Sequence, residues 1–264
     1  MGQTRGAISF AIVLTAVSVQ GGAQGRDAAQ APQPGELQAY LQQAQGVSHP
    51  TSTLLDAIVE GLHSDEVATR RAAMGAMGAV VRAISTADTN PADIQRVQTH
   101  DGLQRSLLEA TRAADPMTRT TAVSYLGSPA VRQSSHLNDV WMQLAGSDPE
   151  PRVREQAVYQ LGKFGAGNAI VAAAVTSALR DPEARVQKQA ALAVAKLHPP
   201  AAVPILVAEL EAGVDEARFE FAYALLSYED QARQHLPLLR AVTARESRRP
   251  EREALERALQ HLGQ

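Results

Sequence analysis

Apolar residues recur at helical spacing almost without a break from residue 37 to the end of the chain. One stripe consists of Leu54, Leu55, Ile58 and Leu62, in which neighbouring turns supply residues three or four positions apart. Residues at this spacing lie on one face of an α-helix. No stretch alternates apolar and polar residues long enough to predict a β-sheet, so the pattern predicts an all-α chain.

The helical pattern is organised as a repeat. The stretch "SDPEPRVREQAVYQLGKFG" begins at Ser147, and a near-copy, "RDPEARVQKQAALAVAKLH", begins 33 residues later at Arg180. Further copies occupy 119–127, more faintly 70–78, and 216–226. A second helical run precedes each copy, at 54–62, 103–113, 136–145, 168–180 and 201–212. A fixed period of this kind indicates a stacked unit, predicted here as helix, tight turn, helix.

Asp-Pro pairs mark several of the turns between the two helices of a unit. They are Asp115-Pro116, Asp148-Pro149 and Asp181-Pro182. Aspartate is expected to cap the incoming helix by accepting backbone N–H bonds, and proline fits the first helical turn because its missing donor costs nothing there.

Five such pairs, an opening helix near 36–45 and closing helices near 230–243 and 251–262 fill the chain. Neither helix of a pair can bury its apolar stripe alone, so neighbouring pairs must stack. The predicted fold is an α-solenoid of stacked antiparallel helix pairs, with the polar last helix closing the open end of the core.

The repeat residues resemble a known family. The pattern "D-P-x-x-R-V-R-x-x-A-x-x-x-L-G" is matched at 148–162, and at 181–195 with Gln187 and Ala195 replacing Arg and Gly. It is similar to HEAT-like repeats, in particular to the short variety found in phycobilin lyases. The resemblance implies a right-handed solenoid in which the second helix of each pair lines the concave surface.

The first 36 residues differ in composition from the rest. Arg5 precedes an apolar stretch at 7–19, and Gly21 and Ala23 supply the small residues expected before a cleavage site. This pattern is typical of a secretory signal peptide. We expect residues 1–23 to be a signal peptide, 24–36 a flexible linker and 37–264 the solenoid. The mature protein is then exported, periplasmic or secreted, without stable membrane insertion.

Charge and residue usage exclude several kinds of chemistry. The formal net charge is −3, which disfavours general nucleic-acid binding. The chain has no cysteine, so disulfides and thiol catalysis are excluded. The seven histidines lie mostly at predicted helix ends without metal-ligand spacing, and are interpreted as solvated or capping residues. No cofactor, metal or catalytic residue is predicted.

One surface is a candidate binding site. If Val153, Ala157 and Leu161 face the core, Glu155 and Tyr159 point nearly opposite, at 100° per residue. Transfer along the repeat gives three rows: Gly75, Ser124, Tyr159, Leu192 and Leu225; Arg71, Thr120, Glu155, Lys188 and Phe221; and Arg152, Arg185 and Arg218. Its C-terminal part is predicted to bind a protein or peptide through Tyr159, Leu192, Leu225, Phe221, Lys188, Arg152, Arg185 and Arg218.

An alternative interpretation makes this surface purely structural. It assigns Leu192, Phe221 and Leu225 to contacts with the next repeat, and pairs the arginines with Glu150, Glu183 or Glu216. For function, the leading hypothesis is an exported, non-catalytic scaffold that binds a protein or peptide. The alternative is a phycobilin-lyase-like enzyme or chromophore-binding protein. A HEAT-like nucleic-acid-binding protein is a third reading, disfavoured by the acidic charge and the predicted export.

Overall fold

The computed structural model describes residues 35–47, 49–85, 89–129, 131, 136–213 and 216–263. The predicted signal peptide, and the predicted linker up to residue 34, lie outside these ranges. In the described ranges every regular element is a helix. The α-helices are α1 (Leu37–Gln43), α2 (Ser52–Leu62), α3 (Val67–Ala83), α4 (Pro91–Gln98), α5 (Leu103–Ala110), α6 (Pro116–Leu126), α7 (Leu137–Ser147), α8 (Pro151–Phe164), α9 (Ala169–Ser177), α10 (Ala184–Leu197), α11 (Ala202–Ala212), α12 (Arg218–Leu226), α13 (Asp230–Arg233), α14 (Leu236–Arg245) and α15 (Arg249–Leu262), with 3₁₀ turns at Ala44–Gly46 and Ala178–Arg180.

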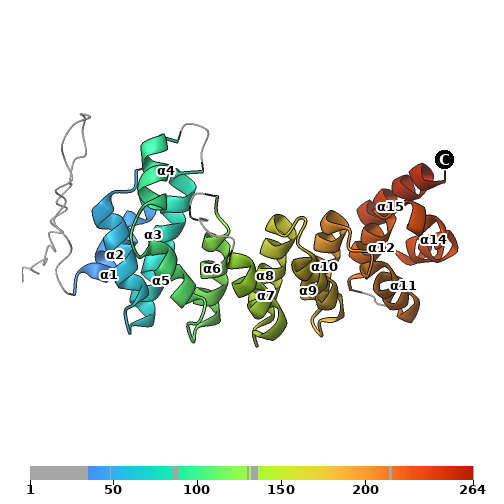
Figure 1. Ribbon diagram of the computed structural model, residues 1–264, viewed down its shortest axis with the longest axis horizontal. Helices are drawn as coiled ribbons and strands as arrows, with labels where there is room; N and C mark the ends of the chain where they lie inside the picture. The colour runs from blue at the N-terminus through green and yellow to red at the C-terminus, as the bar shows by residue number, and fades with distance from the viewer. Residues whose placement is uncertain are drawn as a thin grey trace, which may run out of the picture.

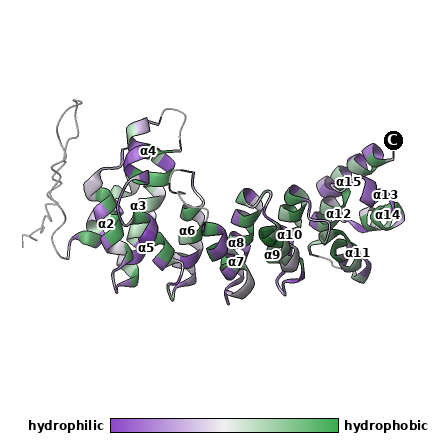
Figure 2. Ribbon diagram, viewed as in Figure 1, coloured by the Kyte–Doolittle hydropathy of each residue, from purple (hydrophilic) through white to green (hydrophobic). Residues whose placement is uncertain are grey.

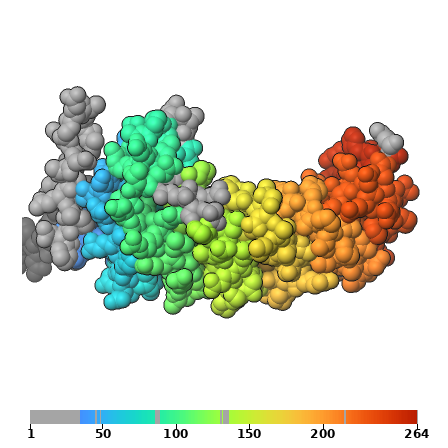
Figure 3. All heavy atoms as spheres, in the orientation of Figure 1, coloured from blue at the N-terminus to red at the C-terminus, as the bar shows by residue number. Residues whose placement is uncertain are grey.

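The helices form pairs that follow one another in a row (Figure 1). The pairs are α2/α3, α5/α6, α7/α8, α9/α10, α11/α12 and α14/α15, and the helices of each pair pack together. The second helices also pack on one another in succession, from α3 through α6, α8, α10 and α12 to α15. Figure 3 shows the colours advancing in sequence order along the long axis. The predicted all-α solenoid of antiparallel helix pairs is confirmed.

One continuous apolar core runs through the stack. Leu55, Val123, Leu161, Leu206 and Leu255 come from successive pairs and all belong to it. Figure 2 shows α9 and α11 dominated by hydrophobic residues. No single pair can hide this much apolar surface, so the stability of each pair depends on its neighbours.

Glycine in the repeat motif allows close packing of the second helices. A Cβ added at Gly162 of α8 would lie 2.6 Å from Cβ of Ala193 on α10. The "L-G" at the end of the motif therefore leaves room for the next second helix.

The second arginine of the motif joins neighbouring pairs. Arg154 donates from Nη1 to the carbonyl oxygens of Asp148 and Pro149, at 2.9 and 3.3 Å, within its own pair. Its Nε and Nη2 donate to both carboxylate oxygens of Asp181, in the next pair, at 2.8 and 2.9 Å. Arg119 repeats this arrangement with Asp148. The Asp-Pro turns therefore lie along one edge and are bridged by arginines.

The aspartates of these turns act as helix caps at one position of three. Asp115 is the N-cap of α6 and accepts from the backbone N–H of Thr118 at 3.0 Å, as expected. At α8 and α10 the expectation was wrong, because the N-caps are Glu150 and Glu183. Asp148 and Asp181 precede these caps and accept from their backbone N–H groups at 2.9 Å, which leaves both carboxylates within reach of the bridging arginines.

Two elements differ from the sequence prediction. Helix α4 was not predicted, although Asn90 caps it through the backbone N–H of Ala92 and Pro91 begins its first turn. The helix predicted at 230–243 is divided into α13 and α14, and α14 has a proline in its first turn. Proline removes a backbone donor and clashes with the preceding turn, which accounts for the break.

Candidate partner-binding surface

Three consecutive second helices each leave one large apolar side chain in solvent. Tyr159 on α8 is 40% exposed, Leu192 on α10 is 37% exposed and Tyr223 on α12 is 46% exposed. Helix α8 packs on α10, and α10 packs on α12, so these side chains belong to adjacent helices of one layer. We call the following set the exposed strip: Arg152, Glu155, Tyr159, Lys163, Arg185, Lys188, Leu192, Lys196, Phe219 and Tyr223.

The structure places four of the predicted site residues on this strip as isolated or partly exposed groups. Tyr159, Leu192 and Arg152 are exposed, and Lys188 is partly exposed. The alternative that assigned Leu192 to a buried contact is therefore wrong for that residue. The part that these residues play in binding stays a prediction.

The structure contradicts the assignment of Phe221 and Leu225 to the surface. Both side chains are 0% exposed and belong to the core. Ala217, Phe221 and Leu225 occupy the core positions that Val186, Ala190 and Val194 fill in α10, so the repeat step into α12 is 31 residues. The prediction used a step of 33, which the match between "EAR" at 216–218 and at 183–185 favoured.

The same two-residue difference changes the role of Arg218. With a step of 31 it corresponds to Gln187, the position of the bridging arginines, and not to Arg185. Its Nη1 donates to the carbonyl oxygen of Arg245 in the next pair at 3.2 Å. The assignment of Arg218 to the rim of the binding surface was therefore wrong, because it lies on the edge that joins neighbouring pairs.

Arg185 crosses from one helix of the strip to the next. Its Nε donates to Oε2 of Glu155 on α8 at 2.8 Å, and both side chains are partly exposed. The alternative that paired Arg185 with Glu183 of its own turn is not what the structure shows. Exposed pairs of this kind contribute about 1 kcal/mol or less to stability. The pair mainly fixes the positions of the two charges on the surface.

Aromatic side chains mark the C-terminal end of the strip. The rings of Phe219 and Tyr223 stack with centroids 5.9 Å apart, and the guanidinium of Arg248 lies 6.0 Å from the Phe219 centroid. Arg248 in turn donates to the buried Glu246 at 3.0 Å and holds the pKa of that carboxyl below its usual range. Sequence reasoning missed Phe219 and Tyr223, although their i, i+4 spacing puts both rings on one helix face.

The N-terminal part of the same layer is hollowed between α3 and α6. A pocket of about 300 Å³ is lined by Arg71, Met74, Gly75, Met117, Thr118, Thr121 and Tyr125. Burial raises the pKa of Tyr125, whose hydroxyl donates to the carbonyl oxygen of Met74 at 3.0 Å. Arg71 and Gly75, which the sequence placed in the same rows as Glu155 and Tyr159, thus line a separate pocket.

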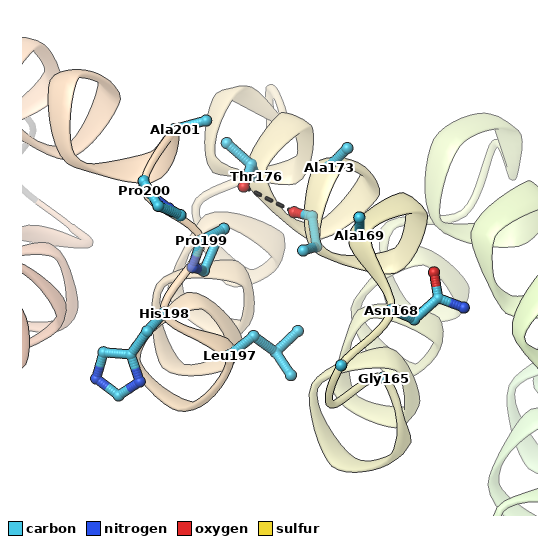
Figure 4. Close-up of a pocket in the computed structure, with 12 residues that line it drawn as sticks. Gly165, Asn168, Ala169, Ala173, Thr176, Leu197, His198, Pro199, Pro200 and Ala201 are labelled. Atoms are coloured by element: carbon cyan, nitrogen blue, oxygen red, sulfur yellow. Dashed lines mark hydrogen bonds between the residues drawn. The ribbon is translucent and has the colours of Figure 1, made fainter.

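A larger hollow lies outside the exposed strip, between α9 and the turn that leads into α11. This pocket of about 410 Å³ is lined mainly by small and apolar residues, together with Asn168, Thr176 and His198. Figure 4 shows the His198 ring directed away from Thr176 and Asn168. That ring packs edge-on against Tyr228, 5.3 Å between centroids. Asn168 and Thr176 both make local bonds within α9, so the pocket has no catalytic arrangement of side chains.

Three of the histidines lie beside carboxylates, where the sequence analysis expected solvated or capping residues. The ring nitrogens of His49, His63 and His100 are 2.9, 2.7 and 3.1 Å from Asp93, Glu109 and Asp56, respectively. Hydrogen bonds to the Val59 carbonyl and then to Glu109 raise the pKa of His63. In the described ranges no group of three His, Asp or Glu side chains could hold a metal ion, and no helix has the length and hydropathy to span a membrane.

Comparison with known proteins shows a likeness of fold. No protein-family model matches the sequence, and no curated protein matches it. An engineered protein solved by the Northeast Structural Genomics Consortium has a TM-score of 0.57 at 18% identity, over 79% of this chain and 98% of its own. A designed armadillo repeat protein in complex with the peptide (KR)4 has a TM-score of 0.56 at 17% identity, over 79% of this chain and 99% of its own. The chain therefore has the fold of a HEAT- or armadillo-type helical-repeat solenoid.

Proposed function

We propose that the protein is a non-catalytic scaffold that holds a protein or peptide partner on the exposed strip of α8, α10 and α12. The observation that carries this proposal is the recurrence of one solvent-exposed apolar side chain on each of three helices packed side by side: Tyr159, Leu192 and Tyr223. Apolar anchors surrounded by polar and cationic groups are the composition of protein-binding surfaces.

The construction of the strip supports binding more than chemistry. Its side chains are carboxylate, amine, guanidinium, phenol and hydrocarbon groups spread over three helices, and its one carboxylate, Glu155, is engaged with Arg185. The designed armadillo protein shows that a solenoid of this kind accommodates a peptide. A shared fold does not establish a shared activity, so the proposal rests on the strip itself.

Site-specific photo-crosslinking tests this function. A photoreactive phenylalanine analogue is placed at Tyr223 of the full chain, and a matched variant carries it at Ile170, which is 70% exposed on α9 in the other helix layer. We expect a discrete crosslinked partner from the Tyr223 position, and its loss when Tyr159 and Leu192 are both changed to aspartate. Equal crosslinking from both positions, or crosslinking that survives the double change, would contradict the proposal.

We also propose that the scaffold is exported, on the pattern of residues 1–23 alone. The support is the sequence of a basic residue, an apolar stretch and small residues before Gln24. N-terminal sequencing of the protein from its native cells tests this directly. A mature chain that begins near residue 24 supports export, and an intact N-terminus on cytoplasmic protein would contradict it.

A further inference from the structure

The exposed strip has a positive charge that the chain as a whole lacks. Its portion on α8 and α10 contains five cations and one carboxylate: Arg152, Lys163, Arg185, Lys188, Lys196 and Glu155. The whole chain has a formal net charge of −3. The strip is therefore a local concentration of positive charge on an acidic protein.

Most of these cations are not neutralised by the protein. Arg185 is paired with Glu155. Arg152, Lys188 and Lys196 make no ion pair with any described residue, and Lys163 contacts only the Phe164 ring, with its Nζ 5.0 Å from the centroid. Unpaired cations beside apolar anchors steer and hold a partner of opposite charge.

The positive character ends at α12. There the position that corresponds to Arg185 is occupied by Glu216, and the anchor is Tyr223, next to Phe219. The strip is therefore cationic along α8 and α10 and aromatic at its C-terminal end.

The spacing of the anchors sets the spacing of a matching ligand. Packed helices lie about 8–10 Å apart, so Tyr159, Leu192 and Tyr223 provide one anchor for each such step. An extended or polyproline-type peptide advances about 3.1–3.3 Å per residue, so every third side chain meets an anchor. The two residues between anchors then lie within reach of the flanking cations.

On the basis of the proposed function, we propose that the partner presents an acidic, extended segment, with an apolar residue at about every third position and Asp or Glu between them over α8 and α10. Phosphate chains are also anionic, but they fit the strip less well. Glu155 stands among the cations, and the three anchors are suited to side chains that carry their own apolar groups. A nucleic acid is thus the competing outcome of the test.

Peptide display on the full chain tests this inference. A library of random peptides of roughly nine residues, the length that spans three anchors, is selected on the protein and counter-selected on Tyr159→Asp/Leu192→Asp. We expect the enriched peptides to be acidic, and their affinity to fall by about tenfold or more for Lys163→Glu/Lys196→Glu. The matched control, Arg105→Glu/Arg240→Glu, makes the same change of net charge at exposed positions of α5 and α14 and should bind as the parent does.

The outcomes separate this inference from the function on which it rests. Enriched peptides that are neutral or basic, yet are lost on Tyr159→Asp/Leu192→Asp, would overturn the acidic partner and leave the scaffold function standing. If no peptide depends on these two residues, both proposals fail. A single-stranded oligonucleotide that displaces the enriched peptides and binds more tightly, through Lys163 and Lys196, would also overturn the peptide assignment.

Discussion

The guanidinium of Arg119 forms two hydrogen bonds of 2.8 Å with the carboxylate of Asp148, which lies in the turn of the next helix pair. The third nitrogen, Nη1, donates to the carbonyl oxygens of Ala113 and Ala114 in the turn of its own pair. One buried side chain therefore connects the turns of two neighbouring pairs. Arg154 and Asp181 repeat the connection one pair further along.

Removing one partner of this bridge should destabilise the solenoid strongly. In Asp148→Ala the buried Arg119 loses its counter-charge, and breaking a buried pair in this way costs about 3–5 kcal/mol. The matched change Glu155→Ala breaks an exposed pair and should cost about 1 kcal/mol or less. Denaturant unfolding of both variants measures the difference. Equal, small losses would show that the bridge does not hold the pairs together.

The glycine at the end of the motif should be intolerant of a methyl group. Gly162→Ala places a Cβ 2.6 Å from Ala193, and overpacking of this kind costs about 1–3 kcal/mol. Gly146→Ala, in α7 with no atom within 4 Å of the added Cβ, should be neutral or stabilising by up to about 1 kcal/mol. Unfolding free energies of opposite direction are expected. A neutral Gly162→Ala would mean that α8 and α10 pack less closely than described.

The 31-residue step into α12 is tested by two adjacent aromatic residues. Phe221 is fully buried, so Phe221→Ala should lower the free energy of unfolding by about 3–5 kcal/mol. Tyr223 is exposed, so Tyr223→Ala should cost about 1 kcal/mol or less. Thermal or denaturant unfolding decides between the two registers. The reverse order of effects would restore the 33-residue step.

Tyr228 should make stability depend on pH at the alkaline end. Burial raises the pKa of Tyr228 from 10.0 to about 12. The folded protein thus favours the neutral phenol, whose stabilisation is complete below pH 10 and is lost as the pH rises toward 12. The difference in unfolding free energy between the parent and Tyr228→Phe should shrink across this window. A constant difference would place the phenol in solvent.

The repeat made most of the fold predictable, because each motif position has a structural job that recurs. Val153, Ala157 and Leu161 are buried as the helical period required. Helix α4 was missed because it interrupts the repeat, and the period therefore gave no reason to expect it. The bridging role of Arg154 could not be read from local pattern, since its partner, Asp181, lies 27 residues away in another pair.

The candidate surface was predictable only where the repeat was regular. Tyr159 and Leu192 were placed on the surface correctly because 33 residues separate equivalent positions in α8 and α10. Beyond α10 the step shortens, and a local match of three letters outweighed the phase of the buried residues. Following the apolar phase of Ala217, Phe221 and Leu225 would have identified Tyr223 as the exposed side chain.

The most direct test of the binding surface is the affinity of one selected peptide for Leu192→Asp and for Ile170→Asp, measured by calorimetry together with the melting temperature of each variant. Both residues are exposed, but Leu192 is at the centre of the strip and Ile170 lies on α9. We predict that Leu192→Asp loses about tenfold or more in affinity with its melting temperature nearly unchanged, while Ile170→Asp binds like the parent. Unchanged binding by Leu192→Asp, or a collapse of its melting temperature, would contradict the account.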